Sequence, residues 1–390
     1  MHKVKALITQ IYVLKHIFLL IFTILLYSEK SLATAFRDSI KNKNITSLVI
    51  EAEVENGGIL AFGEVKEKTF QDAYYNGVNV KVGWKIHKSQ DQYFKLYNNP
   101  IYGIGLYSST FHNKVVGSPY AVYGFVQTPF GNIDNEKWLF DYRIGLGLSG
   151  NFKPYHENEN PLNLAIGTKN NVFIDFGIRS QYKISSKITA GLGLAFHHFS
   201  NGALQLPNKG VNLVPLTASV TYHPNVIKTV KDSSTIQAYS DKLYYHVNIG
   251  AGWKQVQRDL DKRFFKSTLS SYVSRHISHK WRLGLGGELF YSASGNSEEI
   301  AEEKSGKLSS YLSGGPSLYV AHVLNQDLLL NGNIGYYIHN QDFNGEIQKI
   351  FLRAGFRYYV YKNLNAGVSI KAHKGKADYI EWTTGYTFKR

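Results

Sequence analysis

The stretch Ile188-Thr-Ala-Gly-Leu-Gly-Leu-Ala-Phe-His-His-Phe-Ser200 indicates the fold, because its residues alternate in kind with a period of two. The even positions are apolar from Ile188 to Phe196, whereas the odd positions are mostly small or polar. In a β-strand, alternate side chains point to opposite faces. Such a strand suits the wall of a transmembrane barrel, with one row facing lipid and the other facing the lumen.

The same alternation recurs from about Ser47 to the end of the chain, in segments of roughly ten to fourteen residues separated by Gly, Asn, Ser, Asp and Lys. Helical periodicity is nowhere sustained. We predict an all-β, antiparallel, outer-membrane type barrel fold of about 16 strands. The expected strand cores begin at Leu48, Asp72, Ile101, Tyr120, Trp138, Val172, Ile188 and Val211, and then at Leu243, Phe264, Trp281, Leu308, Leu328, Ile350, Leu364 and Ala377.

The first 35 residues have the order of a secretory signal peptide. Two lysines precede an apolar core from Ile17 to Tyr27, and Ala33-Thr34-Ala35 follows as a small-residue cleavage site. The apolar core is shorter than the roughly 20 residues that a membrane-spanning helix needs. We therefore expect export with cleavage after Ala35 and insertion into the outer membrane of a Gram-negative cell.

Composition agrees with a barrel. The chain holds Tyr 28, Phe 22 and Gly 35 but Pro 9, a mixture typical of pleated strands and of aromatic belts at membrane surfaces. Cys 0 excludes a disulfide or a thiolate metal site. The net charge of +15 suits a polyanion, and after an export signal we expect phosphorylated lipid rather than nucleic acid.

The strands fall into two sets of eight, so we expect a first half over residues 36–224, a linker over 225–241 and a second half over 242–390. Thr189-Ala-Gly-Leu-Gly-Leu in the first half is echoed by Asn365-Ala-Gly-Val-Ser-Ile in the second. Such Gly-rich alternation also arises by chance in barrels, so duplication stays open. The sequence also leaves open one wide barrel or two small ones, and whether the protein forms a homodimer.

The alternation between even and odd positions, here called parity, identifies the candidate site at one hairpin. His198 and Ser200 continue the apolar even row of the first strand, and Asn212 begins the even row Val214, Leu216, Ala218, Val220 of the next. Three polar side chains are therefore expected outside the barrel, at one end of it. Polar groups facing lipid are costly and tend to be functional.

These residue types fit nucleophilic ester hydrolysis. His198 and Ser200 lie two residues apart on one face, and Asn212 can orient the imidazole from across the hairpin. We predict that His198 takes the proton of Ser200. Asn201, Gly202 and Asn208 are expected to supply oxyanion donors. An Asn201-Gly202 turn is the simpler interpretation of that pair, but it does not account for the polar residues on the apolar row.

Here the chain resembles the outer-membrane lipid A 3-O-deacylases of the PagL type, also described as acyloxyacyl hydrolase-like. The family pattern His-x-Ser-Asn, then Pro-Asn, is matched by His198, Ser200, Asn201, Pro207 and Asn208. The strand count extends the resemblance loosely over Ser47 to Tyr222. It implies an eight-stranded barrel with a His base and a Ser nucleophile on its lipid-facing wall, and Asn residues in the oxyanion hole.

The sequence departs from the family at Asn212, where the family has a Glu that orients the His. An Asn can accept from the imidazole but cannot stabilise imidazolium by charge. Our first hypothesis is an ester hydrolase that removes an acyl chain from lipid A or a related outer-leaflet glycolipid, without cofactor or metal. The alternative is a catalytically inactive structural or pore-forming barrel.

Other polar residues are assigned to structural roles. The parity of His197 places it in the lumen, and the same holds for His373 and Glu381 near the end of the chain. The acidic run from Glu298 to Glu303 is expected in a solvated outer loop, because a run alone does not create metal-binding geometry.

Overall fold

The computed structural model describes residues 45–71, 73–88, 92–131, 137–225, 236–373 and 376–389. The expected signal peptide, residues 1–35, lies outside the described residues. No helix within these ranges is both long enough and apolar enough to cross a membrane.

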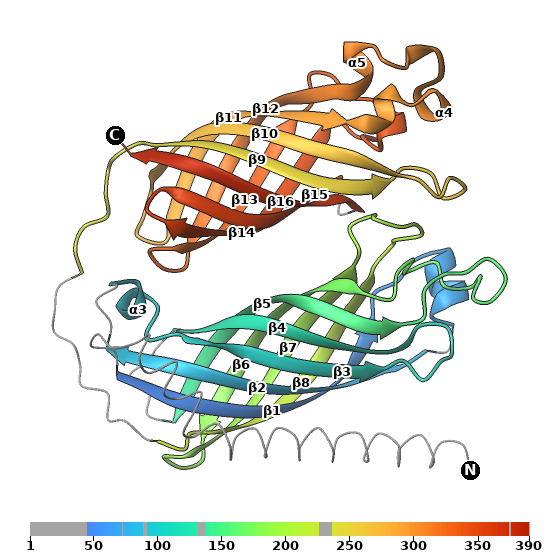
Figure 1. The fold of residues 1–390 in the computed structure, drawn as a ribbon. Coiled ribbons are helices and arrows are strands. Elements are labelled where there is room, and N and C mark those ends of the chain that lie inside the picture. Colours follow the sequence, from blue (N-terminus) through green and yellow to red (C-terminus); the bar gives the residue numbers. More distant parts are fainter. Residues whose placement is uncertain are drawn as a thin grey trace. The chain divides into compact units, whose positions relative to one another are not determined.

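The first eight strands form one closed antiparallel barrel in which each strand pairs with its sequence neighbours (Figure 1). Pairing of the first strand with the eighth closes it, from Ile50 opposite Tyr222 to Ile59 opposite Leu213. Closure leaves no strand edge unpaired. The strands are β1 Ile45–Ile59, β2 Tyr75–Lys88, β3 Ile101–Thr110, β4 Gly117–Phe130, β5 Trp138–Phe152, β6 Asn171–Lys183, β7 Ile188–Ser200 and β8 Val211–Tyr222.

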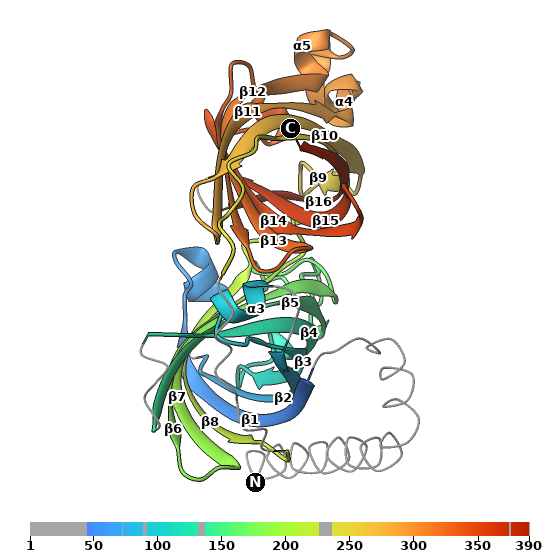
Figure 2. The same cartoon turned by 90° about the vertical axis from the view of Figure 1, so that its left-hand side faces the viewer.

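The last eight strands close a second barrel, whose ring is visible in Figure 2. Its closing pair is the first strand with the last, from Lys389 opposite Tyr244 to Trp382 opposite Ala251. The chain therefore forms two eight-stranded barrels rather than one wide barrel. The strands are β9 Tyr244–Gln255, β10 Arg263–His276, β11 Trp281–Ser292, β12 Leu312–Val323, β13 Leu328–Tyr336, β14 Ile350–Tyr361, β15 Leu364–His373 and β16 Lys376–Lys389.

Thirteen of the sixteen predicted strand starts lie inside an observed strand, and Leu243 lies one residue before β9. The predicted start at Asp72 lies outside the described residues, and Leu308 does not begin a strand. Leu308–Tyr311 forms the single helical turn α5, and β12 begins at Leu312. The N–H of Ser310 donates to the Lys307 carbonyl at 2.8 Å, and its hydroxyl donates to the Lys304 carbonyl. These local bonds compete with strand pairing. The other short helices are η1 Val65–Thr69, α3 Gln92–Leu96, η2 Ala293–Asn296, α4 Glu298–Ala301, η3 Glu302–Lys304 and η4 Asp342–Asn344.

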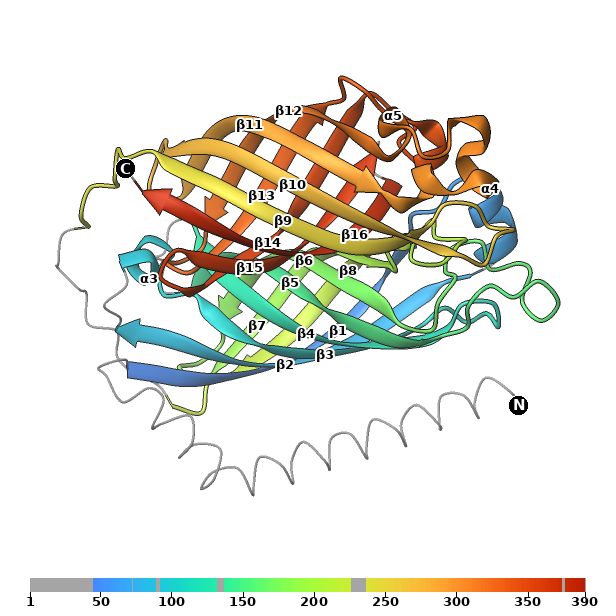
Figure 3. The same cartoon turned by 45° about the horizontal axis from the view of Figure 1, so that its top comes forward.

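The barrel walls follow the predicted alternation, with apolar side chains outside and polar ones inside (the tilted strands are seen in Figure 3). On the first barrel Leu192 is 68% exposed, Leu194 55% and Leu216 68%. Their neighbours in sequence are turned inward, and Ala195 on β7 and Thr217 and Ser219 on β8 are buried. An apolar outer row and a polar inner row are typical of barrels that cross a membrane.

Charged residues fill the lumen of the first barrel as a paired network. Arg143 donates to Asp175 at 2.6 Å and to Glu53 at 3.2 Å. Lys81 lies 2.7 Å from both Glu51 and Glu53. Buried charges are tolerated when they are paired and hydrogen-bonded. The lumen of this barrel is therefore a packed interior, and its paired side chains support the β7–β8 wall from the inner face.

Candidate functional site

His198 and Asn212 face each other directly across the hairpin of β7 and β8. His198 Nδ1 lies 2.6 Å from Asn212 Oδ1, and both side chains are half-buried on the outer side of the wall. An amide oxygen can only accept a hydrogen bond, so the proton of the imidazole is on Nδ1. The lone pair of Nε2 is then left free to take a proton.

Ser200 ends β7 two residues beyond His198, and its side chain is buried. Its Oγ accepts two hydrogen bonds, from Asn208 Nδ2 at 2.8 Å and from the backbone N–H of Gly202 at 3.1 Å. Among the hydrogen bonds of the described residues, none joins Ser200 to His198. Hydrogen bonds that take part in catalysis are often long or poorly aligned until a substrate binds.

The loop after Ser200 is organised around the amide of Asn208. While Nδ2 of this amide donates to Ser200, its Oδ1 accepts the backbone N–H of Asn201 at 3.2 Å. The side chain of Asn201 points elsewhere, donating to the Gln205 carbonyl at 2.9 Å and to Thr168 Oγ1 at 3.1 Å. Of the three predicted oxyanion donors, the structure thus brings Gly202 and Asn208 to Ser200, whereas Asn201 braces the loop.

Gly210 completes the site and was not singled out from the sequence. Its φ of +78° suits glycine, and a Cβ added there would lie 2.9 Å from Cε1 of His198. Its N–H donates to the Ala165 carbonyl at 3.0 Å, which ties the hairpin to the 153–170 loop. The sequence signal for it is a glycine directly before β8.

His197 lies on the lumen side, as predicted from parity. It is fully buried, with Nε2 at 2.9 Å from Glu55 Oε2 and Nδ1 at 3.2 Å from Asp175 Oδ1. Adjacent residues 197 and 198 are therefore on opposite faces of the wall. His197 belongs to the packed lumen, and His198 belongs to the site.

The other residues weighed in the sequence also have structural surroundings. His373 and Glu381 are buried in the second lumen, where His373 Nε2 lies 3.1 Å from the Tyr337 hydroxyl and Glu381 accepts from Arg353. The acidic run forms α4 and η3, and Glu299 pairs with Lys262 at 3.0 Å. In the described part of the chain, no group of three or more His, Asp or Glu is placed to hold a metal ion.

Comparison with solved structures returns outer-membrane barrels at low identity. The crystal structure of the outer membrane enzyme PagL is 12% identical with a TM-score of 0.31, covering 44% of this chain and 97% of that one. Neisserial surface protein A is 9% identical with a TM-score of 0.29, covering 46% and 98%. The siderophore receptor PirA from Pseudomonas aeruginosa is 8% identical with a TM-score of 0.23, covering 89% and 81%. No curated protein matches the chain.

Two family models match, one for each barrel. Residues 78–221 match the lipid A 3-O-deacylase (PagL) family, and this range includes His198, Ser200 and Asn212. Residues 243–390 match the C-terminal domain of acyloxyacyl hydrolase. The first barrel is thus similar to the lipid A 3-O-deacylase family, and the second barrel is similar to the C-terminal domain of acyloxyacyl hydrolase.

Proposed function

We propose that this protein is an outer-membrane ester hydrolase that removes an acyl chain from lipid A or a related glycolipid, using Ser200 and His198. The observation that carries the proposal is the hydrogen bond between His198 Nδ1 and Asn212 Oδ1 on the outer wall, two residues from Ser200. It leaves Nε2 of His198 as a base. The match of the first barrel to the lipid A 3-O-deacylase family supports lipid A as the substrate.

In the proposed reaction, Ser200 Oγ turns from Asn208 towards His198, gives its proton to Nε2 and attacks the ester carbonyl. The donors that now hold Oγ, the Gly202 N–H and Asn208 Nδ2, pass to the oxyanion that forms. His198 then protonates the sugar oxygen as it leaves with the glycolipid. Water, activated by the same histidine, releases the fatty acid from Ser200.

The apolar outer rows give the acyl chain a place beside the site. Leu192 and Leu194 on β7 and Leu216 on β8 are exposed in line with His198 and Asn212. In a membrane this wall faces lipid, so a substrate can reach Ser200 by moving within the leaflet. No step of this scheme uses a cofactor.

The test is the mass spectrum of lipid A from a Gram-negative host carrying the native gene, no gene, or Ser200→Ala. We expect one acyl chain to be lost only with the native gene. Ser219 is a buried serine on the lumen face of β8, so Ser219→Ala is the matched control and should behave as native. A Ser-directed phosphonate probe should label the native protein and Ser219→Ala but not Ser200→Ala.

Identical lipid A spectra from all these strains would refute the proposal. Ion conductance in planar bilayers together with that result would favour the alternative, an inactive pore-forming barrel. The paired charges that fill the first lumen oppose conductance through that barrel.

A further inference from the structure

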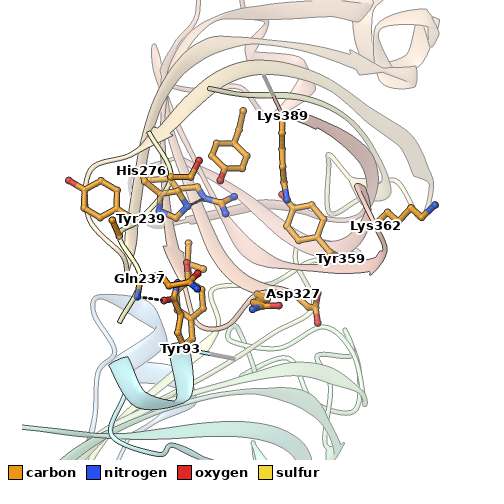
Figure 4. Close-up of a pocket in the computed structure, with 15 residues that line it drawn as sticks. Tyr93, Gln237, Tyr239, His276, Asp327, Tyr359, Lys362 and Lys389 are labelled. Carbon is orange, nitrogen blue, oxygen red and sulfur yellow. Dashed lines mark hydrogen bonds between the residues drawn. The ribbon is translucent and has the colours of Figure 1, made fainter. Parts of the chain in front are cut away.

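Several cations that have no acidic partner among the described residues lie at one end of the second barrel. At this end, here called the short-turn end, residues 277–280, 324–327 and 362–363 join the strands. Arg282 from β11, Lys362 and Lys389 line a pocket there together with Tyr244, His276 and Tyr359 (Figure 4). Among the second-barrel residues that line this pocket, Asp327 is the one acid.

Arg282 is the buried cation of this group, with 7% of its surface exposed. Its Nε donates to Nε2 of His276 at 2.9 Å. The other ring nitrogen of His276, Nδ1, lies 3.0 Å from the Ser278 carbonyl and must donate to it. The imidazole is therefore an uncharged acceptor, because its proton is on Nδ1, and it leaves the charge of Arg282 uncompensated.

The remaining contacts of Arg282 do not supply an anion either. Its Cζ lies 4.2 Å from the centroid of the Tyr244 ring, which is a cation–π contact. Its Nη1 is buried and has no hydrogen-bond partner in the described structure. Burying a hydrogen-bond donor without a partner costs free energy, and the cost is larger when the donor is charged.

Arg353, a second buried arginine in the same lumen, is paired with carboxylates. It donates to Glu288 at 3.0 Å and to Glu381 at 2.9 Å. Arg357 lies between Arg353 and Arg282 along the lumen, and it donates to the Tyr272 hydroxyl while its Nε has no partner in the described structure. Among the described residues, the two buried arginines of this lumen that have no carboxylate partner, Arg282 and Arg357, therefore lie on the short-turn side of Arg353.

We propose that the short-turn end of the second barrel binds a phosphate-type oxyanion, with Arg282 as its buried ligand. A guanidinium offers two parallel donors that match the oxygens of phosphate. Lys389, whose Nζ lies 5.9 Å from the centroid of the same Tyr244 ring, adds a second positive charge at the rim. Several cations around one site favour a multiply charged anion over a single carboxylate.

The source of the anion follows from the position of the site. In outer-membrane barrels the short turns face the periplasm. The phosphate then comes from a soluble phosphate ester or from a phospholipid headgroup at the inner leaflet. Both offer the same chemistry to Arg282.

The experiment uses the purified full chain in an uncharged detergent and measures binding of inorganic phosphate and glycerol phosphate by calorimetry. A parallel arm measures phosphatidic acid retained by the protein, using native mass spectrometry. Arg282→Gln should weaken whichever ligand binds by at least about tenfold, as expected for lost charge-assisted hydrogen bonds. Arg275→Gln, an exposed outward residue on β10 next to His276, should bind as native.

Heat-modifiable migration on gels, in which heated and unheated samples are compared, shows whether each variant is folded. If Arg282→Gln does not fold, Lys389→Gln at the exposed strand end tests the site and should weaken binding by a smaller factor. Binding of soluble phosphate alone or of phosphatidic acid alone supports the site and identifies its source. Absence of both in the native protein, or equal binding by the folded variants, would overturn the proposal.

Discussion

Asn212 Oδ1 lies 2.6 Å from His198 Nδ1, and the two residues are direct partners in the register of β7 and β8. An amide thus holds the imidazole in the orientation that a carboxylate would impose. It fixes the tautomer but supplies no negative charge when the ring is protonated.

Replacing Asn212 by Asp should increase the rate of deacylation. Asp has the same shape, so it keeps the bond to Nδ1 and adds the charge that stabilises imidazolium. In a serine protease the reverse change costs about 10⁴ in turnover, and we expect a gain of at least about tenfold here. Initial rates on purified lipid A measure it, with Asn212→Ala expected to fall below native. Equal rates for all three proteins would show that this contact has no part in the reaction.

Asn208→Asp should lower the turnover number while leaving the loop intact. Aspartate keeps the oxygen that accepts from Asn201 but loses the Nδ2 donor that now reaches Ser200. Loss of one oxyanion donor typically costs about 10² to 10³ in turnover. Steady-state kinetics should show this loss mainly in kcat. A variant with native kcat would mean that Asn208 serves only the loop.

Gly210→Ala should impair activity by displacing the His198 ring. The added Cβ would lie 2.9 Å from Cε1 of His198 at a φ of +78°. Gly131→Ala is a close control, because Gly131 has a φ of +77° and nothing within 4 Å of an added Cβ. Both variants bear similar backbone strain, so the Gly210 variant alone should lose activity on lipid A. Equal losses would indicate that strain, rather than the ring contact, is responsible.

Arg143→Met should destabilise the first barrel without touching the outer wall. It removes the arginine partner of Asp175, which keeps only His197, and one partner of Glu53, both fully enclosed in the lumen. Breaking a buried ion pair from one side costs about 3 to 5 kcal/mol. The midpoint of urea unfolding should fall, whereas Lys187→Met on an exposed turn should leave it unchanged. A native midpoint for Arg143→Met would show that the network contributes little.

The sequence predicted what depends on local alternation. Parity placed His198 and Asn212 on the outer face and His197 in the lumen, and the structure has them there. It failed at Leu308, where hydrogen bonds within one turn override the strand pattern. The signal peptide up to Ala35 stays a prediction.

What the sequence could not supply are relations between distant segments. The bond from Asn208 to Ser200 depends on the path of a loop, and Gly210 matters only because His198 lies beside it. The partners in the lumen are far apart in the chain, as with Arg179 and Glu51. One wide barrel and two small ones differ in whether β1 pairs with β8, and no local sequence pattern predicts that pairing.

That choice has a consequence for biogenesis. Each half of the chain satisfies its own backbone hydrogen bonds, because β1 meets β8 and β9 meets β16. The machinery that inserts this polypeptide into the membrane must therefore close two barrels, each by pairing its first strand with its last. Cleavage of the chain between Asn225 and Ile236 would therefore leave both rings of strands closed.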